Sequence, residues 1–272
     1  MSSATPDQDA QAAREALTRL LQLMRRLRDP LQGCPWDRAQ DFASIAPYTI
    51  EEAYEVAEAI AHEDPEAIRS ELGDLLFQVV FHARLAEERG WFDFAAVAQG
   101  IHDKLVRRHP HVFDPAFVPG PAGLSGDWER HKAQERAQSG ATGTLAGVPT
   151  ALPALTRAAK LGRRAARVGF DWPDAAGARL KVDEELREIE SALQAGEGEA
   201  RVAEEMGDLL LAVTSWARQL GVDPEQSLRG ANRRFETRFA CMERLAAAQG
   251  RELAGLSLEE WEALWQQAKR TV

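Results

Sequence analysis

The chain has 272 residues, and its 43 acidic residues outnumber its 33 basic ones, which gives a formal net charge of −10. A surface this acidic disfavours duplex nucleic acid as the main partner, because phosphate contacts need clustered lysine and arginine. The two cysteines, Cys34 and Cys241, lack the paired spacing of a zinc site or a disulfide framework. The N-terminus has no apolar signal core, and no run approaches the ~18 apolar residues of a membrane span. We therefore expect a cytoplasmic protein that binds neither nucleic acid nor membrane.

Apolar residues recur at helical spacing along almost the whole chain, and β-type alternation is scarce. The pattern predicts an all-α fold. Pro65 and Pro224 each suit the first turn of the helix that follows them. In chain order, we expect helices at residues 10–28, 48–62, 65–89, 94–108, 126–138, 152–167, 176–194, 199–220, 224–247 and 257–270.

The composition changes between about residues 110 and 150. Two stretches rich in glycine, proline and small residues flank one polar helix there, which is typical of a linker. The sequence therefore predicts an N-terminal domain at 10–113, a linker with a short helix at 114–150, and a C-terminal domain at 151–272.

The two halves repeat each other at an offset near 135 residues. EEAYEVAEAI at 51–60 returns as EELREIESAL at 184–193, and ELGDLLFQVV at 71–80 returns as EMGDLLLAVT at 205–214. One EExxE motif is common in acidic helices. Two copies, each followed by a matching ExxD motif, are hard to attribute to chance and point to a shared function.

Each copy places four carboxylates on two neighbouring helices. Residues three apart share a helix face, and a short connection makes the two helices antiparallel neighbours. The acids either form a solvated face paired with lysine and arginine, or hold a cation near the apolar interior. Carboxylate oxygens suit Mg²⁺, with Mn²⁺ as a substitute. The predicted metal ligands are Glu52, Glu55, Glu71 and Asp74 in the first half, and Glu185, Glu188, Glu205 and Asp208 in the second.

Basic side chains accompany the acids at helical spacing. They either pair with the acids or clamp a polyphosphate whose other oxygens the metal bridges. Lys181 precedes Glu185 by four residues and shares its face. The other candidates form two pairs, Lys104 with Arg108 and Arg234 with Arg238.

Three further residues have more than one interpretation. Trp265 precedes Lys269 by four residues, so it could stack on a base while the lysine binds phosphate, or it could simply dock the last helix. Glu184 points about 100° away from Glu185, as a surface residue, an outer ligand or a general base. A GxxxxGK[ST] motif is absent, which disfavours a P-loop phosphotransferase.

The EExxE and ExxD pattern, with the segments GCPWD, ELGDLLFQVVFHA and RRHPHVF, resembles the MazG family of nucleoside triphosphate pyrophosphohydrolases over nearly the whole chain. The resemblance implies two tandem all-α helical-bundle domains that dimerisation completes. It also implies Mg²⁺-dependent cleavage of NTPs or dNTPs between the α and β phosphates, which yields NMP and pyrophosphate. Such an enzyme would fit a role in the removal of non-standard nucleotides. It would also fit a connection to a toxin–antitoxin or stress pathway.

The resemblance also implies roles for single residues. The first half departs from the family at Tyr48, which stands at the position of Lys181, and at His102, which stands at that of Asn232. We therefore expect the main catalytic site in the second half. The family's metal ligands fall on the eight acids above, its phosphate contacts on Lys181, Arg234 and Arg238, and the rear of its pocket on Trp265 and Lys269.

The mechanism that we expect involves Lys181, Glu184 and Glu185. One of the two glutamates takes a proton from a metal-activated water that attacks the α-phosphorus, while lysine and arginine neutralise the departing pyrophosphate. Two alternatives stay open. One is hydrolysis of another phosphorylated nucleotide, such as dUTP or a ppGpp-type alarmone, and the other is a non-catalytic helical adaptor.

Overall fold

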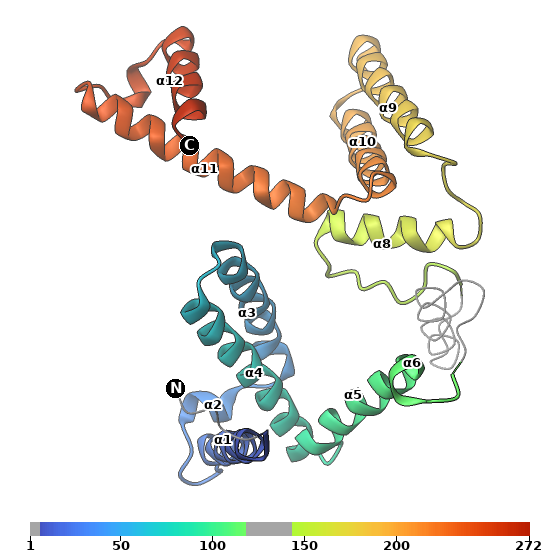
Figure 1. Ribbon diagram of the computed structural model, residues 1–272. Helices are drawn as coiled ribbons and strands as arrows, with labels where there is room; N and C mark the ends of the chain where they lie inside the picture. The colour runs from blue at the N-terminus through green and yellow to red at the C-terminus, as the bar shows by residue number, and fades with distance from the viewer. Residues whose placement is uncertain (1–5, 118–142) are drawn as a thin grey trace. The chain divides into compact units, whose positions relative to one another are not determined.

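The computed structural model describes residues 6–117 and 143–272, and the regular structure there is helical throughout (Figure 1). The all-α prediction is confirmed. The expected helix at 126–138 lies outside the described residues. The helices are α1 (Pro6–Leu27), α2 (Pro35–Ala39), α3 (Phe42–His62), α4 (Pro65–Glu88), α5 (Phe94–Arg108), α6 (Pro110–Phe113), α8 (Ala154–Ala166), α9 (Ala175–Ala195), α10 (Glu199–Gln219), α11 (Pro224–Ala248), the 3-10 helix η1 (Leu253–Gly255) and α12 (Leu258–Thr271).

None of the described helices combines the length and the hydropathy that crossing a membrane requires.

The chain divides into two compact units, residues 1–131 and 132–272. Part of the segment that composition assigns to a linker is packed on the second unit. Arg164 of α8 donates hydrogen bonds to the carbonyl oxygens of Ala146 and Gly147, and the neighbouring Val148 is buried. The domain boundaries at 113 and 151 stay a prediction.

The first unit is built around the hairpin of α3 and α4, which pack along each other (Figure 1). Only Glu63 and Asp64 join the two helices, so they run antiparallel. Helix α1 packs on α4, and α5 packs on α4 as well. The buried core of this unit consists of Met24, Ile45, Val80, Phe81 and Leu85.

The second unit repeats this order of helices. Helix α8 packs on α10, which forms a hairpin with α9, and α11 contacts both α8 and α10. Helix α12 packs on α11 (Figure 1). The repeat also extends further than the acidic motifs, because LTRLLQLMRR at 17–26 in α1 returns as LTRAAKLGRR at 155–164 in α8. A second core cluster lies between α11 and α12, at Cys241, Met242, Ala246, Leu264 and Ala268.

Capping side chains set where the helices begin. Asp41 caps α3 and forms a capping box with Ser44. The helix therefore begins at Phe42, and the predicted start at residue 48 is wrong. Pro47 lies in the second turn of α3, where it removes one backbone hydrogen bond without ending the helix. The short elements α2, α6 and η1 were not expected from periodicity, because they span too few residues to show it.

Candidate metal and nucleotide site

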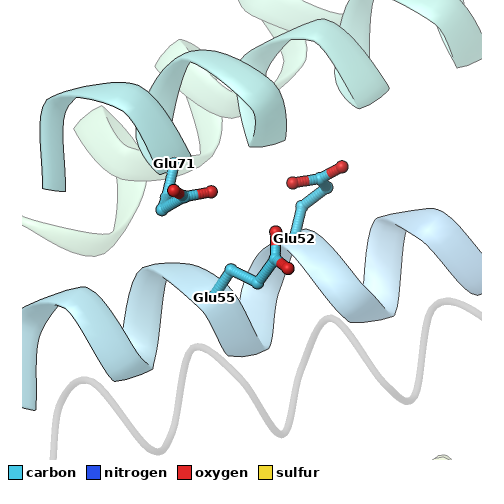
Figure 2. A group of neighbouring side chains, drawn as sticks. All are labelled: Glu52, Glu55 and Glu71. Carbon is cyan, nitrogen blue, oxygen red and sulfur yellow. The ribbon is translucent and has the colours of Figure 1, made fainter. Parts of the chain in front are cut away.

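The first acid cluster lies between α3 and α4. Glu52 and Glu55 project from α3 toward Glu71 on α4 (Figure 2). Their carboxylate oxygens lie within 4.8 Å of one another. Burial, together with the charges of neighbouring acids that include Asp74, raises the pKa of Glu52 and of Glu71. The four acids predicted from spacing are therefore brought together.

The second acid cluster lies between α9 and α10. One oxygen each from Glu185, Glu205 and Asp208 lies within 4.8 Å of the others. This cluster is more deeply buried than the first, since Glu185 is 3% exposed and Glu205 is 2% exposed. Glu188 lies beside them, and its pKa is raised by desolvation and by the charges of Glu185 and Glu205. The second predicted set of four acids is therefore also assembled.

The second cluster contains two cations from its own helices. Lys181 Nζ lies 2.8 Å from Glu184 and 2.7 Å from Glu185, and hydrogen bonds to these two carboxylates raise the pKa of the lysine. Arg201 forms an ion pair with Glu205. The sequence interpretation missed Arg201, although it precedes Glu205 by four residues, as Lys181 precedes Glu185.

The second cluster fits a divalent metal ion by its donor set. Glu185 Oε2 is fully buried and has no hydrogen-bond partner among the described residues, although the other oxygen of this carboxylate binds Lys181. A buried carboxylate oxygen without a partner is costly. A hard cation held by converging carboxylates removes that cost. The oxygens of Glu185, Glu205 and Asp208 therefore form a donor set that fits Mg²⁺.

Glu184 is connected to the site through Lys181. Its side chain is 48% exposed, whereas that of Glu185 is 4% exposed. Both glutamates bind the same ammonium group, although they leave the helix in different directions. Glu184 thus lies at the wet edge of the cluster and not among its converging oxygens.

The remaining predicted substrate-binding residues of the second half lie on α11 and α12. The guanidinium of Arg238 lies 5.9 Å from the centre of the Trp265 ring, and the Arg234 side chain runs along Gly230 of its own helix. Asn232 and Lys269 lie on the same two helices. Within the described residues, no hydrogen bond or ion pair joins this group to the acids of α9 and α10.

The corresponding first-half residues lie on α5, which packs on α4. Lys104 and Arg108 are both half-buried there. His102, which stands at the position of Asn232, pairs with Asp103 at 2.9 Å. Tyr48, at the position of Lys181, contacts Trp36 edge to face, with the ring centroids 6.2 Å apart.

Comparison with known proteins identifies the family. A MazG nucleotide pyrophosphohydrolase domain matches residues 40–113. The nucleoside triphosphate pyrophosphohydrolase of Escherichia coli (strain K12) is 51% identical over 255 residues, which cover 93% of this chain and 97% of the relative. The chain belongs to the MazG nucleotide pyrophosphohydrolase family, and it is an enzyme of that hydrolase family.

A second MazG relative supports the assignment along both halves. The nucleoside triphosphate pyrophosphohydrolase/pyrophosphatase MazG of Thermotoga maritima is 42% identical over 250 residues, which cover 92% of this chain and 94% of the relative. The uncharacterized protein YabN of Bacillus subtilis is 43% identical over 92% of this chain, but the match covers only 50% of that protein. The domain match at 40–113 includes the first acid cluster, and the longer matches extend over the helices of the second.

Proposed function

We propose that this MazG protein hydrolyses nucleoside triphosphates between the α and β phosphates and releases NMP and pyrophosphate, with Mg²⁺ as its cofactor and Mn²⁺ as a substitute. The family and the names of its relatives support the reaction. The observation that carries the metal requirement is the unpaired, buried Glu185 Oε2 among the converging acids of the second cluster.

The residues of the second cluster have different roles in the proposed reaction. Glu185, Glu188, Glu205 and Asp208 hold the metal, which when bound polarises the attacking water and offsets phosphate charge. Lys181 lies beside the acids and is fully protonated at neutral pH, so it binds a phosphate oxygen. Glu184 is open to water, which suits a group that accepts the proton of the attacking water and passes it to solvent.

The main catalytic site is proposed to be the second one. Within the described residues, a lysine lies against the acids in the second cluster alone, because the first cluster has Tyr48 at that position. The remaining phosphate contacts are proposed for Arg234, Arg238 and Lys269, with Trp265 for the base, and Lys104 and Arg108 are their first-half counterparts.

A homodimer is proposed as the functional form. Both acidic hairpins expose large apolar side chains that no element of the described chain covers. Examples are Ile60 and Leu72 on the first hairpin, and Leu193 and Leu211 on the second. A second copy of the chain would bury these faces and complete each pair of helices as a bundle.

The first test is a nucleotide panel with and without Mg²⁺ that separates pyrophosphate from orthophosphate. The panel contains the NTPs, dUTP and a ppGpp-type nucleotide. Wild type is compared with Glu71→Gln, Glu205→Gln and the control Glu190→Gln, which removes an exposed acid of α9 outside the cluster. We expect Mg²⁺-dependent NMP and pyrophosphate, lost with Glu205→Gln and retained in the control.

The other outcomes distinguish the alternatives. Equal partial losses with Glu71→Gln and Glu205→Gln would mean two working sites. Turnover of dUTP alone, or of the ppGpp-type nucleotide alone, would show that this nucleotide is the substrate and that NTPs in general are not. Metal-dependent turnover that is unchanged in Glu205→Gln would refute the assignment of the second cluster, and the absence of any product would favour a non-catalytic adaptor.

A further inference from the structure

In the second acid cluster, an arginine of the chain itself is already paired with one of the acids. Arg201 forms an ion pair with Glu205, which is almost fully buried and is one of the three converging acids. A guanidinium and a divalent cation repel each other, and a metal ion bound in this cluster would have to share the Glu205 carboxylate with Arg201. A metal ion that binds Glu205 therefore does so in competition with Arg201.

Arg201 has other ion-pair partners besides Glu205. Its guanidinium also lies 3.1 Å from Glu204 and 3.7 Å from Glu197, and both of these acids are exposed. If the arginine leaves Glu205, it can keep these two partners, Glu204 on α10 and Glu197 in the connection just before that helix. Displacement then requires only a movement of one half-exposed side chain and leaves the helix in place.

The first cluster lacks this arrangement. The position four residues before Glu71 is Ala67, where the second half has Arg201. The position four residues before Glu52 is Tyr48, where the second half has Lys181. The two clusters therefore offer similar sets of carboxylates to a metal ion, but among the described residues only the second has its converging acids in ion pairs with cations of its own helices.

We propose that Arg201 is a built-in competitor for the metal ion, so that metal enters the second cluster by displacing Arg201 from Glu205. This inference rests on the proposed function, because it concerns the same metal site. It follows that the second cluster fills at higher free metal concentration than the first. The arginine thus sets the metal concentration at which the main catalytic site becomes loaded.

The test is calorimetric titration of the full chain with Mn²⁺ alone, in the absence of nucleotide. The Glu71→Gln background leaves only the second cluster intact. In this background, we expect Arg201→Ala to lower the Kd for Mn²⁺ about 10-fold. The control is Arg187→Ala, which removes one positive charge from an exposed position about 200° around α9 from Glu185, and its Kd should not change.

The reciprocal variant introduces the competitor into the first cluster. In the Glu205→Gln background, Ala67→Arg should raise the Kd for Mn²⁺ about 10-fold. Ala67 is half-buried in the first turn of α4, so an arginine there can reach solvent and Glu71. This variant also decides the matter if Arg201→Ala, which leaves a buried carboxylate unpaired, fails to fold in a thermal melt.

The outcomes separate this inference from the proposed function. If Mn²⁺ binds wild type but its Kd is unchanged or higher in Arg201→Ala, and Ala67→Arg has no effect, the competitor role is refuted and the metal site stands. If Mn²⁺ binds neither cluster in any folded variant, the metal requirement of the proposed function fails as well.

Discussion

Glu184 and Glu185 are neighbours in sequence and bind the same ammonium group of Lys181, but their surroundings differ. Glu185 is buried and has an oxygen with no partner, which suits a metal ligand. Glu184 is about half exposed, which suits a group that exchanges protons with water. Adjacent carboxylates can therefore serve different steps of one reaction because their solvation differs.

Replacing Glu184 by glutamine tests that division. We expect kcat/KM to fall about 100-fold, because a positioned general base contributes at least that much. The Kd for Mn²⁺ should stay unchanged, because Glu184 is not among the converging oxygens. An unchanged kcat/KM would show that Glu184 only pairs with Lys181 at the surface.

The pH dependence of the first cluster follows from the raised pKa of Glu52 and Glu71, which burial and neighbouring acids cause. A carboxyl whose pKa is raised in the folded state stabilises the fold below its unfolded pKa and loses that contribution as pH rises through the folded value. We therefore expect these two carboxyls to contribute less to the stability of the metal-free protein as pH rises above the ordinary glutamate pKa of 4.5, and Mn²⁺ to offset that loss.

Thermal melts from about pH 4 to about pH 8, with and without Mn²⁺, check this expectation. Glu71→Gln should show a flatter pH dependence in the metal-free protein and a smaller gain from Mn²⁺. The same slope in wild type and variant would mean that the acids of the first cluster do not govern the pH response.

At the scale of the helix, the two acidic hairpins end their first helix differently. Gly196 ends α9 in the left-handed conformation, at φ 67°. Glu63 ends α3 in the same conformation, at φ 55°, and it is the one described residue other than glycine with a positive φ. A side chain makes this conformation unfavourable, so glycine is the usual residue at this position.

Glu63→Gly should therefore stabilise the protein by about 1 kcal/mol, and Gly196→Ala should destabilise it by about as much. Urea unfolding, with the midpoint and slope of each variant compared with wild type, measures both changes. A lower midpoint for Glu63→Gly would show that the Glu63 side chain makes a compensating interaction.

Helical periodicity and spacing were enough to predict most of the helices and both acid clusters. Acids three apart share a face by helix geometry alone, and a two-residue connection leaves α3 and α4 little choice but to pack together. Local signals were also present for features that the interpretation missed. Asp41 and Ser44 form the capping box that indicates the start of α3, and Arg201 lies one turn before Glu205.

Other features depend on packing that periodicity does not specify. The relation of Arg238 and Trp265 to the acids depends on how α11 and α12 dock, and their own sequences fix only which residues share a face. How deeply each acid is buried also depends on packing between helices. Glu52 and Glu185 stand at the same position of nearly identical motifs, yet Glu52 is only partly buried and Glu185 is buried, because different side chains surround the two hairpins.

At the scale of the whole molecule, exposed apolar surface and charge act in opposite directions. The net charge of −10 keeps copies of the chain apart at long range. The apolar faces of the two hairpins favour association at contact, because burying them removes hydrocarbon from water. Association by these faces places apolar surface of one copy against apolar surface of the other, close to the acid clusters on the same hairpins.

A charge on the second hairpin should break such a dimer. Light scattering after gel filtration should give wild type twice the chain mass of 30.0 kDa. Leu193→Glu combined with Leu211→Glu, at positions 62% and 51% exposed, should give a folded species of lower mass, because a buried unpaired carboxylate opposes association. Leu258→Glu is the control, since Leu258 is 84% exposed on α12, outside the hairpins. Wild type at the mass of a single chain would refute the dimer, and loss of mass in the control would show that the face lies elsewhere.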